Sequence, residues 1–178
     1  MFVTNSVDSI VSALGVNVGA YTPGIDVKVM ILAVLGGSIS LSIISGFMGV
    51  LLSERAERVR ELRELERKLG ASLRGSIYAR ATTIIPLYVA LWSSTGMLLF
   101  PLVMVVPYLA SLAGLIGVWE AFLASTAISL VSLMAVGGYL GVITGEGILI
   151  SALRTLGLGL LVLIIVLVFK QTFTTLVG

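Results

Sequence analysis

The chain has 178 residues, of which 58% are hydrophobic and 11% are charged, and its mean hydropathy is +1.14. Soluble domains carry about a quarter charged residues, so this composition excludes an ordinary soluble domain and indicates an integral membrane protein. Cysteine and histidine are absent, which excludes disulfides, thiolate or imidazole metal sites and Ser-His or Cys-His nucleophiles, and no motif points to an enzyme or to nucleic-acid binding.

Long charge-free runs predict an all-α fold with helices that cross a membrane. Such runs follow Lys28, Arg80 and Glu120, and each is longer than the roughly twenty residues that a spanning helix needs. A β-barrel is excluded because barrel strands alternate polar and apolar residues over about ten positions. We expect a single membrane domain over residues 1–178, with helices over about 26–53, 81–110, 117–143 and 147–172.

The run over 81–110 contains three prolines, Pro86, Pro101 and Pro107. Proline lacks the backbone N–H that a helix interior needs, and its ring clashes with the preceding turn. We therefore expect these residues to kink or end the second long apolar helix.

The first twenty-one residues are ambiguous. The stretch over 5–21 is apolar at roughly helical spacing, but it contains Asp8 and Asn17 and is short for a membrane span. Hydropathy alone favours an interfacial helix or a failed span, closed by the turn signal YTPG. If it crosses, the chain has five spans with its N-terminus inside and its C-terminus outside. If it does not, four spans leave both termini outside.

The charge is concentrated in one block. From Glu54 to Lys68 the chain carries eleven of its twenty charged residues, in a sequence rich in strong helix formers. We expect the helix over 26–53 to continue into a charged helix and linker over 54–76. Eight of the eleven lysines and arginines lie in 54–80, so the positive-inside rule places this segment in the cytoplasm.

Four glutamates of this block fall within about 80° of one helix face. They are Glu54, Glu57, Glu61 and Glu64. In one interpretation they are solvated and form ion pairs such as Glu54–Arg58 and Glu64–Lys68. In the other they offer oxygen ligands that collect divalent cations before transport, although the adjacent arginines compete for the same carboxylates.

Four segments, in order, resemble the vacuolar iron transporter family, and the chain is similar to a short, divergent prokaryotic member. They are VDSIVSALGVNVGA, GGSISLSIISGFMGVLLSERAER, GMLLFPLVMVVPYL and GGYLGVITGEGILISALRTLGLGLLV. They match, respectively, the family's acidic first helix, its small-residue second helix with a charged extension, the proline-spaced end of the third helix, and the glycine turn with the last helix. Order and spacing carry this resemblance, because each segment alone is unspecific.

The resemblance implies five transmembrane helices, with residues 5–21 as the first and the second extended into the charged cytoplasmic helix. It implies a homodimer in the lipid bilayer, here a prokaryotic plasma membrane, with an ion path that lies between the two subunits and is lined by first and second helices. The implied activity is export of Fe²⁺ or Mn²⁺ from the cytoplasm in exchange for protons, without a prosthetic group. The family's first-helix aspartate corresponds to Asp8, a candidate ligand or proton carrier; alternatively Asp8 is a solvated cap at the cytoplasmic end of a short helix. Asn17 and Ser42 are further candidates for the path, although Asn17 could instead make an interhelical hydrogen bond.

The sequence departs from the family at the end of the second helix. Where the family has a methionine and a glutamate, this chain has Gly46 and Val50, with Met48 offset by two residues as a candidate replacement. The four glutamates of the charged block do not map onto the family's cytoplasmic ligands. At the turn between the last two helices, Glu146 and Arg154 are candidates for an ion pair that acts as a gate or a cap.

A second class of function is consistent with the same residues. The charged helix would be a docking site for a cytoplasmic partner or for anionic lipid in a protein that transports nothing. In that case the apolar stripe of Leu62, Leu65 and Leu69 carries the function, rather than the glutamates.

Overall fold

The computed structural model describes residues 2–177, and their side chains except those of residues 2, 4, 42, 43, 45 and 173–177. This part of the chain is helical and contains no strand, which confirms the all-α class. The elements are α1 (Phe2–Ala20), α2 (Val27–Leu32), η1 (Ala33–Gly37), α3 (Ser38–Leu41), η2 (Ser42–Phe47), α4 (Met48–Leu69), α5 (Ile77–Leu112), α6 (Val118–Thr144) and α7 (Ile148–Val177).

The elements from α2 to α4 follow one another without a loop and form one rod over residues 27–69. Asp26 caps its start by accepting a 2.8 Å hydrogen bond from the backbone N–H of Lys28. Gly70 ends it in the left-handed conformation, with φ of 64°. The predicted continuation of an apolar helix into the charged block is therefore present. The two π-helical turns, η1 and η2, interrupt the rod within its apolar half.

Of the two outcomes expected of the prolines, a kink or an end of the second long apolar helix, the end does not occur. α5 has 36 residues and runs through Pro86, Pro101 and Pro107, all three of which are buried against neighbouring helices. Such positions are tolerated because neighbouring helices and hydroxyl side chains compensate for the lost backbone bonds.

Three helices within the described residues are long and apolar enough to cross a membrane: Ile77–Leu112, Val118–Thr144 and Ile148–Thr172. The apolar helix Val27–Leu41 is shorter. The chain is thus compatible with an integral membrane protein, and these three helices agree within a few residues with the spans expected over 81–110, 117–143 and 147–172.

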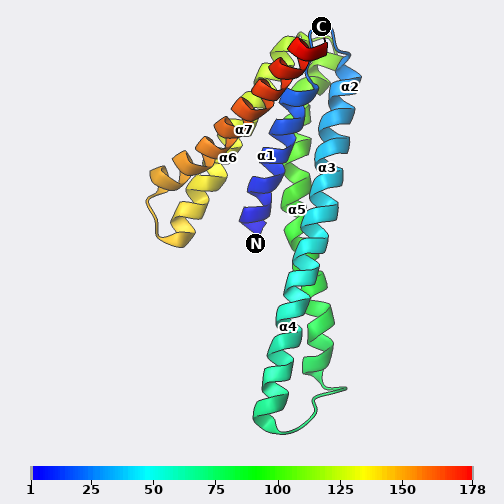
Figure 1. Ribbon diagram of the computed structural model, residues 1–178, viewed down its shortest axis with the longest axis vertical. Coiled ribbons are helices and arrows are strands. Elements are labelled where there is room, and N and C mark those ends of the chain that lie inside the picture. Colours follow the sequence, from blue (N-terminus) through cyan, green and yellow to red (C-terminus); the bar gives the residue numbers. More distant parts are fainter. Residues whose placement is uncertain (1, 178) are drawn as a thin grey trace.

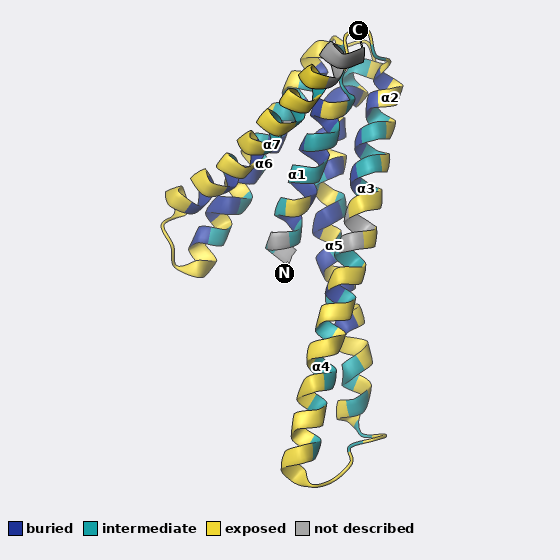
Figure 2. Cartoon of the chain, in the orientation of Figure 1, coloured by how far each residue is buried: buried dark blue, intermediate teal, exposed yellow. Residues whose placement is uncertain are grey.

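The helices are arranged around α1, which packs against α5, α6, α7 and η1. Figure 1 shows α6 and α7 as a hairpin that meets the other helices at the end where α1 finishes and diverges from them towards its own turn. At the opposite end α4 and the first part of α5 project beyond α1 as a two-helix arm. Figure 2 shows that buried residues line the junction of α1 with its neighbours, whereas α4 is largely exposed.

Candidate functional site

Asp8 lies in the second turn of α1, and its side chain is exposed in the single chain. It therefore does not cap the helix, which begins at Phe2. Gly15 and Gly19 follow two and three turns later within about 20° of the same face. There α7 covers α1: a β-carbon added at Gly15 would lie 3.5 Å from a methyl carbon of Val162. The face that carries Asp8 is thus covered along its second half and open at Asp8.

Two hydrogen bonds fix the height of Asp8 along the molecule. Asn5 Nδ2 donates to Ser93 Oγ at 2.5 Å, and one turn later Ser9 Oγ donates to the carbonyl oxygen of Met97 at 2.7 Å. α1 and α5 therefore run parallel, and Asp8 lies level with Gly96. At 1.5 Å per residue this is about 24 Å along α5 from Arg80 and about 24 Å from the end of α5. Asp8 is halfway along the charge-free part of this helix.

Asn17 is fully buried and is held by two other helices. Its Nδ2 donates to Thr126 Oγ1 at 3.1 Å, and its Oδ1 accepts a 2.5 Å hydrogen bond from the hydroxyl group of Tyr108. The amide therefore has a partner at each end, as expected for a buried polar group. Tyr108 thus occupies one of the two lone pairs of the carbonyl oxygen.

The predicted positions on the second helix fall at or near the π-turn η2. Met48 is the first residue of α4 and is 47% exposed. Ser42 lies in η2, and its side chain is outside the described residues. At Gly46 an added β-carbon would overlap the thioether end of Met97, which is 2% exposed. A thioether from α5 thus occupies the space in front of Gly46, a contact that no spacing rule in the sequence predicts.

The glutamate stripe of α4 is partly engaged by arginine. Glu61 pairs with Arg58 at 3.1 Å, and Glu64 pairs with Arg60 at 3.5 Å; the second of these has its partner four residues earlier rather than at Lys68. Glu54 and Glu57 make no ion pair within residues 54–70, all of which the structure describes. In the described part of the chain, no three or more acidic side chains gather into a cluster that could hold a metal ion.

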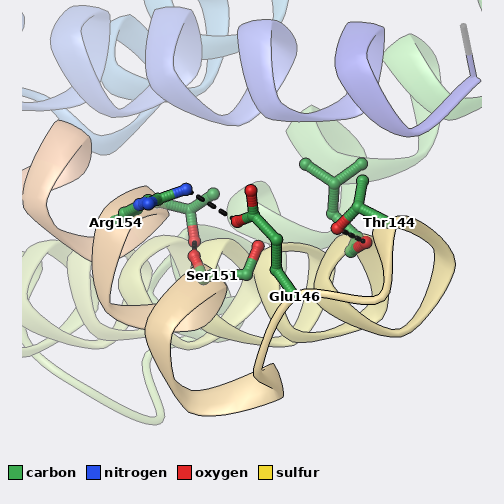
Figure 3. A network of polar contacts seen from close by, with 6 residues as sticks. Thr144, Glu146, Ser151 and Arg154 are labelled. Carbon is green, nitrogen blue, oxygen red and sulfur yellow. Dashed lines mark hydrogen bonds and ion pairs between the residues drawn. The ribbon is translucent and has the colours of Figure 1, made fainter.

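Glu146 and Arg154 meet at the turn between α6 and α7, where Arg154 Nη1 lies 2.6 Å from Glu146 Oε2. Figure 3 shows the pair spanning the turn beside Ser151, with Thr144 at the end of α6. The Arg154 side chain is 67% exposed and the Glu146 side chain 49%, so the pair lies at the surface and not in the interior. Its position favours a cap that joins the turn to α7.

The arm carries a groove between α4 and α5. A cavity of about 450 Å³ is lined mainly by apolar side chains, among them Leu62 and Leu65 of α4 and Ile77 and Tyr78 of α5. Arg58 also lines it, and its Nε is buried without a hydrogen-bond partner. Leu69, the third residue of the predicted stripe, is 63% exposed at the tip of the arm and does not line the groove.

Several residues that build this arrangement were not predicted: Ser93, Met97, Tyr108, Thr126 and Lys170. Lys170 lies alone at the end of an apolar run, and its ammonium group donates to the carbonyl oxygen of Tyr21. A lone cation there is a usable signal for a contact at a helix end.

Comparison with family models, curated proteins and solved structures finds no match for this chain.

Proposed function

We propose that this protein is an integral membrane transporter that exports divalent cations, Fe²⁺ or Mn²⁺, from the cytoplasm in exchange for protons. Asp8 is its central ligand, and α1 and the apolar half of the rod complete five membrane spans. The observation that carries the proposal is the height of Asp8, level with Gly96 and halfway along the charge-free length of α5. A carboxylate at that depth is costly, by about 2.5–3.5 kcal/mol or more, and such residues mark ion and proton pathways.

A carboxylate also supplies a physical basis for exchange. It binds either a proton or a divalent cation, so release of one to the far side allows the other to return. The transported metals suit oxygen ligands, and Met48 or Met97 adds a thioether that Fe²⁺ tolerates better than Mg²⁺ does. The chain needs no prosthetic group for this cycle.

The exposed face of Asp8 supports assembly as a homodimer. A hard divalent cation such as Mg²⁺ or Ca²⁺ takes six or more ligands. Among the described residues, Asp8 belongs to no group of three or more acidic side chains that could hold such an ion. A two-fold axis beside α1 would bring a second Asp8 to the same place, together with the π-turns of the second helix. Closed two-fold symmetry is the commonest arrangement of such assemblies.

The arrangement of basic residues supports an orientation with the arm in the cytoplasm, the N-terminus inside and the C-terminus outside in a prokaryotic plasma membrane. The arm holds eight of the eleven lysines and arginines. Glu54 and Glu57, which lie at its membrane end without ion pairs, are the members of the stripe best placed to collect cations. Glu61 and Glu64 would first have to leave their arginines.

The proposal is tested by uptake of Fe²⁺ and Mn²⁺ into proteoliposomes under a pH gradient. We expect uptake by the wild type and its loss in Asp8→Asn, which keeps the size of the side chain and removes its charge. Asp26→Asn is the matched control, because Asp26 is an exposed helix cap outside the path and Asn is an equally good cap. Uptake that survives in Asp8→Asn would move the path elsewhere, and no uptake of either metal by the wild type would overturn the proposal.

The groove of the arm favours a second candidate function, docking of a partner helix. Its lining is mainly apolar from Ile77 to Ile85, and Arg58 and Glu61 are its charged side chains. Such a lining suits the apolar face of an amphipathic protein helix. The arm has eight basic and five acidic side chains, which favours an acidic helix.

This candidate is tested with two synthetic amphipathic peptides that share one leucine face and carry either glutamate or lysine on the flanks. Docking predicts binding of the glutamate peptide, weakened by Leu65→Asp and by Arg58→Gln. Equal binding of the glutamate peptide by the wild type and Leu65→Asp would mean non-specific attraction, and would count against a docking site.

A further inference from the structure

Ser12 lies on the face of α1 that carries Asp8. It follows Asp8 by four residues, which places it one turn further from the arm and about 40° round the helix. Side chains four residues apart on a helix are neighbours, with β-carbons about 5–6 Å apart. Asp8 is exposed and Ser12 is half-buried. A carboxylate and a hydroxyl group are therefore adjacent on the open face of α1.

Two neighbouring helices border the position of Ser12. On one side, about 60° round α1, Gly15 faces α7, where an added β-carbon would lie 3.5 Å from a methyl carbon of Val162. On the other side, about 40° round, Val16 faces the rod: a β-carbon added at Gly37 would lie 3.2 Å from one of its methyl carbons. Ser12 thus lies at the seam between α7 and the rod, one turn before both of them cover α1.

The hydroxyl group of Ser12 makes no hydrogen bond within the part of the chain that the structure describes. A helical serine commonly bonds the carbonyl oxygen four residues back, as Ser94 and Ser129 do here. Ser9, on the next face of α1, donates to the carbonyl oxygen of Met97. The Ser12 oxygen therefore keeps both of its lone pairs, and hydroxyl oxygens of this kind hold Mg²⁺ in nucleotide-binding loops.

We propose that Ser12 is a second oxygen ligand of the Asp8 site and helps to set its metal preference. With the arm in the cytoplasm, Ser12 lies on the outward side of Asp8, so a departing cation meets its hydroxyl group next. A two-fold axis beside Asp8 would bring together two carboxylates and two hydroxyl groups. Such a set of hard oxygen ligands favours Mn²⁺ over metals that prefer sulfur. This inference rests on the proposed transport function, and the experiment below separates the two.

The test exchanges the Ser12 oxygen for sulfur. Since the chain has no cysteine, Ser12→Cys creates a single thiol of nearly the same size, and thiolates favour Zn²⁺ over Mn²⁺. Ser132→Cys on α6 is the matched control. Ser132 is also half-buried and without a hydrogen bond among the described residues, but it lines a cavity of about 330 Å³ together with Ser6. Ser6 lies about 160° round α1 from Asp8.

Alkylation of the thiol by N-ethylmaleimide in detergent measures binding without transport. We expect Zn²⁺ at ten times its dissociation constant to slow alkylation of Ser12→Cys about tenfold, because bound metal protects the sulfur. The protection should be lost when Asp8→Asn is added, and Ser132→Cys should react at the same rate with or without Zn²⁺. Equal protection of the two cysteines, protection that survives without the Asp8 carboxylate, or no protection of Ser12→Cys would overturn the inference.

Uptake of Mn²⁺ into proteoliposomes tests the natural hydroxyl group. Ser12→Ala should raise the Mn²⁺ concentration for half-maximal uptake about fivefold to tenfold, as the loss of one polar contact to a charge predicts. Ser12→Thr, which keeps the hydroxyl group, and Ser132→Ala should stay near the wild type. An unchanged half-maximal concentration in Ser12→Ala would count against Ser12 as a ligand.

The two readouts separate the two proposals. If the wild type carries no Mn²⁺ while Zn²⁺ still protects Ser12→Cys through Asp8, the transport function fails and the paired ligands stand. If Mn²⁺ is transported and Zn²⁺ does not protect Ser12→Cys, transport stands and Ser12 is not a ligand.

Discussion

Gly137 of α6 leaves room for the side chain of Thr155 of α7, whose hydroxyl group donates a 2.9 Å hydrogen bond to the carbonyl oxygen of Leu133. A β-carbon at Gly137 would overlap this hydroxyl group. The close approach of α6 and α7 therefore depends on a missing side chain, as is common where small residues line helix contacts in membranes.

Replacement of Gly137 by alanine should lower the thermal stability of the detergent-solubilised protein. The added carbon must displace Thr155, and overpacking of this kind costs about 1–3 kcal/mol. We expect the midpoint of thermal unfolding, followed by circular dichroism, to fall by several degrees.

The matched control is Gly157→Ala on α7. A β-carbon there has no neighbour within 4 Å, and alanine is the better helix former, by about 1 kcal/mol. Its midpoint should stay unchanged or rise. Equal losses in both variants would show that the close approach at Gly137 is not what limits stability.

The contact of Gly46 with Met97 predicts that their effects on stability are coupled. Gly46→Ala forces the Met97 thioether out of its place. Met97→Ala alone leaves a cavity where a buried side chain was, at a cost of about 2–5 kcal/mol. In the double variant the new methyl group fills part of that cavity, so the combined loss should be smaller than the sum of the single losses.

Urea or thermal unfolding of the four proteins in the same detergent measures this coupling. Strict additivity would mean that Met97 does not occupy the space in front of Gly46. Gly49→Ala is the control, because a β-carbon at Gly49 has no neighbour within 4 Å; its effect should add to that of Met97→Ala.

The sequence predicted the helices and missed the contacts between them. A segment of about twenty or more residues without a charge indicates a helix that can cross a membrane, and such segments are visible in the sequence itself. It placed the long helices within a few residues, and the charged block marked where the second helix leaves the apolar region. The prolines do not end α5. A helix in water can end at proline because water then bonds the freed backbone groups, whereas Pro86 and Pro101 are buried among helices.

The geometry of the site could not be predicted in the same way. The height of Asp8 depends on which residue of α5 meets Asn5, and nothing in either segment specifies Ser93 rather than another hydroxyl. The sequence left two roles open for Asn17, a cation ligand or an interhelical hydrogen bond, because an amide group can serve in both. Its partner Tyr108 lies ninety-one positions away, a separation at which one sequence carries no pairing signal.

Glu66 should stabilise the turn at the tip of the arm. Its carboxylate accepts a 2.8 Å hydrogen bond from the backbone N–H of Leu73, and the turn is also shaped by Gly70 and Gly75, both with positive φ. Glu66→Ala removes the acceptor and should lower the local stability of the turn by about 1 kcal/mol. Hydrogen exchange of the Leu73 amide should become several times faster.

Glu57→Ala is the matched control for the turn, because Glu57 lies on the same helix, is exposed and makes no ion pair in the arm. Exchange at Leu73 should be unchanged in that variant, and restored in large part by Glu66→Gln, whose amide oxygen can still accept. A response of Leu73 to Glu57→Ala would point to the charge of the arm as a whole and not to the bond from Glu66.

The pair of Glu146 and Arg154 should contribute little to stability and nothing to gating. Both side chains are about half exposed or more, and exposed ion pairs contribute about 0–1 kcal/mol because water and salt screen them. Glu146→Gln and Arg154→Gln should each shift the unfolding midpoint by no more than about two degrees, less at high salt, and leave the cation flux of proteoliposomes unchanged.

The double exchange Glu146→Arg with Arg154→Glu restores the pair in the opposite sense and serves as the control. If the pair acts only as a cap, the exchanged protein should match the wild type in midpoint and in flux. A large change of flux in the single variants, recovered in the exchanged protein, would instead identify the α6–α7 turn as a cytoplasmic gate. That outcome would require the turn to move towards α1 during transport, because the pair now lies where α6 and α7 have already diverged from it.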